Sequence, residues 1–202
     1  MWKKTIIATQ RLCQRMYWQN GWLMYQGRHV ITRETPISQG VYLSETESEA
    51  IVANPESVDH LTRQTLIRTP ACLGIPLKGQ ILSTVTKVTR ESFDDSNDPI
   101  YALQQNNVAA EQKVDIGFFL SARTGVCKHM AITAGLILEN LVAQGILNGY
   151  ARINRSSNTQ HGHAWVRYTN SAGEPLIVDP ALNYAGPVAC TSDWDYRNPQ
   201  ID

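Results

Sequence analysis

Three residues in the second half of this 202-residue chain have the types that nucleophilic catalysis requires: Cys127, His163 and Asp179. A thiolate can attack a carbonyl carbon, an imidazole can take and return the thiol proton, and a carboxylate can hold that imidazole in the right orientation. If the fold brings the three side chains together, the chemistry is that of a thiol enzyme.

The element that carries Cys127 is predicted to be a buried helix from Cys127 to Gln144. We expect Gly145 to end this helix and Thr124 or Gly125 to cap its front. A thiol in the first turn lies at the positive end of the helix dipole, where free N–H groups can also stabilise an oxyanion. Gly125 would let a substrate approach the backbone closely. The helix is predicted from apolar residues at helical spacing, at Cys127, Met130, Ala131, Ala134, Leu138, Leu141 and Val142.

His163 and Asp179 are predicted to face each other across a β-hairpin. Residues 163–169 and 176–179 have strand patterns, and Asn170-Ser171-Ala172-Gly173 between them is typical of a turn. With the turn centred on Ser171, His163 pairs with Asp179, and directly opposed Cβ atoms lie about 4.5–5.5 Å apart. Trp165 and Ile177 share that face and would enclose the pair.

A zinc site is the main alternative use of these residues, because Cys127, His129, His161 and His163 are all possible ligands. On a helix, however, Cys127 and His129 point about 200° apart and cannot hold one ion. We therefore expect no metal, His129 as a surface or cap residue, and His161 at the mouth of the cleft. Together with Trp165 and Gly125, His161 is a predicted substrate-binding residue.

The composition argues against some functions. With 18 basic and 18 acidic residues the net charge is zero, which argues against a nucleic-acid partner. The aromatic and basic residues of segment 12–34 could stack on RNA, but we expect them to fill a core. The acidic residues Asp94, Asp95 and Asp98 lack the glycine and distal glutamate of a calcium loop and indicate a helix-stopping loop.

The N-terminal residues predict neither a signal peptide nor a membrane anchor, because their apolar stretch is only Ile6-Ile7-Ala8. We expect a cytoplasmic protein, or one exported without a cleaved signal, and free thiols at all four cysteines. A helix is also predicted over 79–93, with strands at 21–27 and 149–154. Residues 1–75 are an N-terminal segment of unknown role, expected to be integrated with a core spanning residues 76–202.

Several motifs around the three residues resemble those of the transglutaminase-like superfamily. Gly125-Val126-Cys127 is similar to its Gly-x-Cys helix entry, His163-Ala164-Trp165 to its His-Ala-Trp strand, and Val178-Asp179-Pro180 to its Asp-Pro strand end. Gly145-Ile146 followed by Tyr150-Ala151-Arg152 resembles its helix-to-strand segment. The order Cys, His, Asp and the intervals of 36 and 16 residues suit the family, and the resemblance covers about residues 79–187.

The resemblance implies an α+β, papain-like core, with the catalytic cysteine at the start of a buried helix packed on an antiparallel sheet that carries His163 and Asp179. It implies acyl transfer through a thioester on a protein or peptide carboxamide, with no cofactor. Members of this family crosslink or deamidate glutamine, hydrolyse peptide bonds, or have lost activity. The small size favours a deamidase or protease over a crosslinking enzyme; the alternative is a binding module that keeps the fold without turnover.

The chain departs from the family pattern at two places. Lys128 and His129 stand where the family often has an acidic residue after the cysteine. The oxyanion donor that the family carries upstream has no clear counterpart, and Gln104, Gln105 and Gln112 are the candidates.

Overall fold

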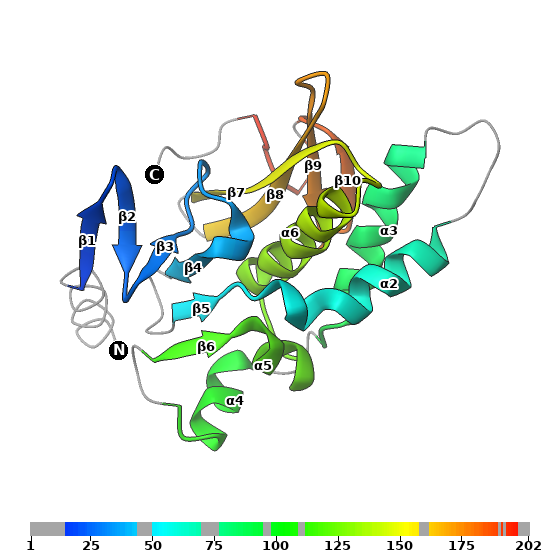
Figure 1. Ribbon diagram of the computed structural model, residues 1–202. Helices are drawn as coiled ribbons and strands as arrows, with labels where there is room; N and C mark the ends of the chain where they lie inside the picture. The colour runs from blue at the N-terminus through cyan, green and yellow to red at the C-terminus, as the bar shows by residue number, and fades with distance from the viewer. Residues whose placement is uncertain are drawn as a thin grey trace.

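A central helix, α6 (Cys127–Ala143), organises the fold and is buried on nearly all sides (Figure 1). Its apolar and small residues let a sheet and two further helices pack around it, and the predicted helix is confirmed to within one residue. Gly145 follows the helix with φ +73°, as expected for a residue that ends a helix. The structure, a computed structural model, describes residues 15–43, 50–69, 77–94, 98–108, 112–157, 162–189, 191 and 193–197.

An antiparallel sheet in the order β10-β9-β8-β7 covers one side of α6. It is formed by β7 (Gly149–Ser157), β8 (Gly162–Asn170), β9 (Pro175–Asp179) and β10 (Tyr184–Pro187). Ala164, Val166 and Val178 point from this sheet into the core around the helix. The predicted hairpin and the predicted strand before it are therefore present.

A second, six-stranded sheet in the order β1-β2-β3-β4-β5-β6 is built mainly from the N-terminal third of the chain. Its pairs are antiparallel except β3–β4 and β5–β6, which are parallel. The strands are β1 (Met16–Gln19), β2 (Trp22–Tyr25), β3 (Arg28–Val30), β4 (Gly40–Leu43), β5 (Ala50–Val52) and β6 (Lys113–Asp115).

The remaining elements are four α-helices and two short 3₁₀ helices. Among these, α2, α3, α5, η1 and η2 contact α6, and α3 also lies against β9 and β10. Their bounds are η1 (Ile37–Gln39), η2 (Pro55–Val58), α2 (Asp59–Arg68), α3 (Leu77–Glu91), α4 (Pro99–Gln105) and α5 (Ile116–Ser121). The helix predicted over 79–93 corresponds to α3, and two sheets with five α-helices in the described residues confirm the α+β class.

Two sequence expectations need correction. Tyr17, Trp18 and Trp22 do not fill a core, because they are exposed on the β1–β2 hairpin, whereas Tyr25 is buried. The front of α6 is capped neither by Thr124 nor by Gly125: the N-cap residue is Val126, which has no polar side chain. Of the acidic loop after α3, residues 95–97 lie outside the described residues.

Candidate active site

Cys127 is the first residue of α6 and is partly buried. Val126 before it is extended, so the chain turns into the helix at the cysteine itself. His129 and Met130 donate their N–H groups to the Val126 carbonyl at 2.9 and 3.2 Å. The sulfur thus lies beside the first turn of a long helix, where partial positive charge favours an anion.

His129 replaces the expected cap. Its Nδ1 accepts a hydrogen bond from the Val126 N–H at 3.0 Å, which requires the proton of the neutral ring to be on Nε2. The ring is fully buried and lies 4.2 Å from the ring of Phe119. Burial, and then the positive charge of Lys128, lower the pKa of His129 well below its ordinary value. Its prediction as a cap residue is confirmed, but it does not lie on the surface.

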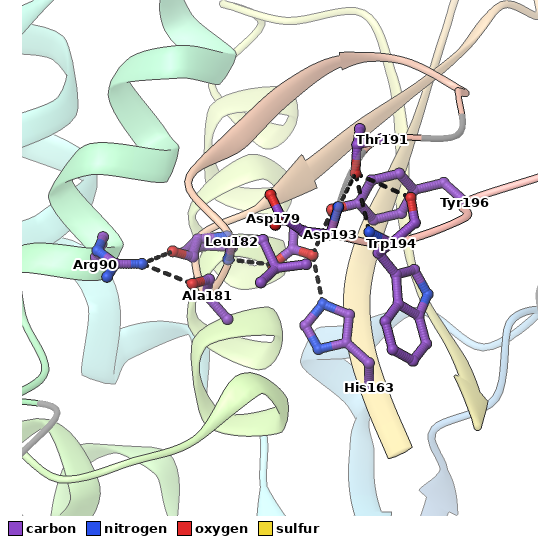
Figure 2. Close-up of polar contacts among 10 residues, drawn as sticks. Arg90, His163, Asp179, Ala181, Leu182, Thr191, Asp193, Trp194 and Tyr196 are labelled. Atoms are coloured by element: carbon purple, nitrogen blue, oxygen red, sulfur yellow. Dashed lines mark hydrogen bonds and ion pairs between the residues drawn. The ribbon is translucent and has the colours of Figure 1, made fainter. Parts of the chain in front are cut away.

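His163 and Asp179 lie together on the face of the four-stranded sheet that carries Trp165 and Ile177, and their side chains point toward each other (Figure 2). The distance from His163 Nε2 to Asp179 Oδ2 is 2.5 Å. The predicted register is wrong, because the ladder pairs Val166 with Val178 and so places Asp179 two residues away from the position opposite His163. A shift of two residues keeps the same face of a strand, so the two side chains still meet.

The carboxylate of Asp179 has no exposed surface and accepts three hydrogen bonds (Figure 2). Besides His163, the Tyr196 hydroxyl donates to Oδ2 at 2.9 Å and the Leu182 N–H donates to Oδ1 at 3.2 Å. Burial, followed by the charge of Asp179 and the hydrogen bond to it, raises the pKa of Tyr196. Tyr196 is therefore a permanent donor that fixes one lone pair of the carboxylate.

The imidazole of His163 interacts with both Asp179 and Cys127. Burial lowers its pKa, but hydrogen bonding to Asp179 and Cys127, and their negative charges, outweigh burial and raise the pKa from 6.5 to about 9. Since Nε2 bonds Asp179, Nδ1 is the ring nitrogen that is left to interact with Cys127. The three predicted catalytic residues are thus brought together, with His163 as a cation at neutral pH.

Aromatic side chains enclose His163. The ring of Trp194 lies 4.9 Å from the imidazole and the ring of Trp165 lies 5.9 Å from it. Trp165 has no exposed surface, so in this arrangement it supports His163 and touches no substrate. A turn holds Trp194 in place, because the Trp194 N–H donates to Thr191 Oγ1 at 3.0 Å and the Thr191 N–H donates to the Trp194 carbonyl at 2.9 Å.

The other predicted substrate-binding residues have different places. Gly125 is buried, and a Cβ there would lie 2.8 Å from the Phe93 ring, so the close approach that this glycine permits is that of Phe93. His161 lies outside the described residues. Of the suggested oxyanion donors, Gln104 and Gln105 belong to the short helix α4, where the Gln105 amide donates to the Tyr101 hydroxyl. Gln112 is exposed just before β6.

Sequence reasoning missed four supporting residues. Tyr196, Trp194 and Thr191 come from a tail that has no strand or helix pattern, and only the spacing Trp-x-Tyr could have pointed to it. Arg90 of α3 donates through Nη1 to the carbonyls of Pro180 and Ala181 at 3.1 and 2.6 Å, and so ties down the chain directly after Asp179 (Figure 2). Such long-range contacts leave no local signal in the sequence.

Comparison with family models, with curated proteins and with solved structures finds no match to this chain. Within the described residues there is no group of three or more histidine, cysteine or acidic side chains placed to hold a metal ion. The same residues contain no helix that is long and apolar enough to cross a bilayer.

Proposed function

We propose that the chain is a cysteine-dependent amide hydrolase of transglutaminase-like type, with Cys127 as nucleophile, His163 as its acid–base partner and Asp179 as the orienting carboxylate. One observation carries the proposal: His163 interacts with Cys127 and bonds the buried Asp179 at 2.5 Å, and together these interactions raise the pKa of His163 to about 9. A purely structural histidine in a sheet needs no cysteine at the start of a helix beside it.

The proposed mechanism uses Cys127 as a thiolate beside the imidazolium of His163, whose pKa is raised to about 9. In the proposed reaction the sulfur of Cys127 forms a bond to the carbonyl carbon, and the oxyanion faces the backbone N–H of Cys127. The C–N bond then breaks as His163 gives its proton to the leaving nitrogen. Water attacks the thioester, His163 takes a proton from that water, and the C–S bond breaks to restore the thiolate. The net change is an amide plus water to a carboxylate plus ammonium or an amine.

The substrate class follows from the sequence resemblance. A protein or peptide carboxamide is the expected substrate, and glutamine deamidation or proteolysis is favoured over crosslinking. In deamidation the released nitrogen compound is ammonia, in proteolysis it is a new peptide N-terminus, and in crosslinking an amine replaces water at the thioester. Assaying glutamine peptides with and without an added amine separates the three reactions.

The first test is the alkylation rate of each cysteine by iodoacetamide between pH 5 and 9, resolved by mass spectrometry. We expect Cys127 to react well below the pH at which ordinary thiols react, and the advantage to disappear in His163→Ala. The other three cysteines are internal controls. Ammonia or peptide release from glutamine peptides should be lost in Cys127→Ala. A Cys127 that reacts no faster than the other cysteines, together with no release of product, would contradict the enzyme and favour a binding module.

A further inference from the structure

A pocket of about 300 Å³ lies on the outer face of β7 and β8 and is lined by three arginines against one carboxylate. Arg152 and Arg167 come from the two strands, and Arg33 and Glu34 come from the segment after β3. Glu34 is mostly exposed and lies 3.6 Å from Arg33, so it offsets only part of this charge. The pocket is therefore strongly basic in a chain whose net charge is zero.

The two strand arginines stand directly opposite each other. The β7–β8 register pairs Arg152 with Arg167, and like charges in directly opposed positions destabilise a sheet. Arg152 is held by its Nε, which donates to the Glu34 carbonyl at 3.1 Å, and its guanidinium lies 5.0 Å over the ring of Tyr150. Arg167 is exposed and has no hydrogen bond or ion pair to another described residue. An anion between the two guanidinium groups would turn this repulsion into attraction.

Two buried polar side chains complete the pocket. Asn154 and Thr169 line it although each is more than nine-tenths buried, and neither side chain makes a hydrogen bond to another described residue. Buried amide and hydroxyl groups normally have partners. Here both side chains line the same pocket as the guanidinium groups, so they can supply donors to an oxyanion bound there.

We propose that this pocket binds an oxyanion group, a phosphate or a carboxylate, through Arg33, Arg152 and Arg167, with Asn154 and Thr169 as additional donors. Arg167 follows His163 by four residues on β8, a distance of roughly 13 Å along an extended strand. An anion held here does not touch the triad. The site is therefore separate from the proposed catalytic function, and either proposal can fail alone.

The test is a titration of the full chain with inorganic phosphate or with glutarate at constant ionic strength. The backbone amide signals of Asn154 and Thr169, and the side-chain amide signal of Asn154, report binding by NMR. We expect saturable shifts with at least one probe, and the better probe identifies the chemical source. Arg167→Gln should weaken binding roughly tenfold, because it removes charge-assisted hydrogen bonds. Arg63→Gln, at an exposed arginine of α2, is the matched charge control and should leave binding unchanged.

The melting temperatures of two variants distinguish a loss of binding from a loss of folding. Without a probe, Arg167→Gln should melt no lower than the parent, since it removes like-charge repulsion opposite Arg152. Asn154→Asp supplies an internal carboxylate and should abolish probe binding without lowering the melting temperature. Absence of saturation by both probes, or saturation that Arg167→Gln leaves unchanged, overturns the proposal.

Discussion

At the scale of single residues, the site depends on how Asp179 and Tyr196 set the charge of His163. Asp179→Asn removes the carboxylate that raises the pKa of His163 above 6.5, so we expect that pKa to fall well below 9. The measurement is the pH titration of the His163 ring proton by NMR. Tyr196→Phe is the control, because it keeps the carboxylate and loses only one donor to Oδ2. An unchanged His163 titration in Asp179→Asn would mean that Asp179 does not control the imidazole.

Two residues beside the nucleophile should give opposite slopes of stability against pH. The pKa of His163 is raised to about 9. Its contribution to the free energy of unfolding is therefore complete below pH 6.5 and is lost as the pH rises towards 9. Burial lowers the pKa of Lys128 from 10.5 to about 7. The free energy of unfolding that depends on Lys128 is therefore highest above pH 10.5, where the amine is neutral in both states, and falls as the pH drops towards 7. Between pH 7 and 9 the two effects oppose each other in the parent.

Replacing either residue should leave only the pH dependence of stability that the other residue causes. Between pH 7 and 9 the free energy of unfolding of Lys128→Met should fall relative to the parent, by about 1 kcal/mol per pH unit, and that of His163→Ala should rise by a similar amount. Urea denaturation at several pH values measures both. Lys128→Met should also be more stable than the parent at pH 6, since it no longer buries a charge. Parallel pH profiles for the three proteins would contradict these pKa shifts.

At the scale of elements, the entry to α6 depends on close packing at Gly125. A Cβ there would lie 2.8 Å from the Phe93 ring and 2.9 Å from His129 Cβ, so Gly125→Ala should cost about 1–3 kcal/mol. Phe93→Leu should recover part of that loss in a double-mutant cycle. Gly79→Ala, on α3 with nothing within 4 Å of its Cβ, is the control and should be neutral or stabilising. Equal effects of the two alanine substitutions would exclude a packing role for Gly125.

The same element shows what the sequence could and could not predict. The length of α6 and the end of the helix at Gly145 followed from local periodicity and turn chemistry, which act within a few residues. The cap of the helix could not be predicted from such local patterns, because it depends on the buried ring of His129 lying against Phe119. The face shared by His163 and Asp179 was predictable from the two-residue period of strands. The register of their two strands was not predictable, because it depends on which residue lies at the centre of the turn.

At the scale of the whole molecule, the N-terminal strands and the helix with the nucleophile share one hydrophobic core. Ile37 packs so closely on α6 that a Cβ on Gly135 would lie 2.3 Å from it. The Glu139 carboxylate of α6 accepts the N–H groups of Ile37 and Ser38 at 2.7 and 2.8 Å. A carboxylate can accept both bonds, whereas an amide has a single acceptor oxygen. The last prediction follows from this connection.

We expect Glu139→Gln to lower the free energy of unfolding by about 1–2 kcal/mol while the transition stays cooperative. Far-UV circular dichroism and the His163-dependent alkylation rate of Cys127 should lose half their signal at the same urea concentration. A fragment of residues 76–202 should show no cooperative transition, because it lacks Ile37 and the other core residues that precede residue 76. A fragment that melts sharply and keeps fast alkylation of Cys127 would instead make residues 76–202 an independent domain. The first 75 residues would then not be needed to form the active site.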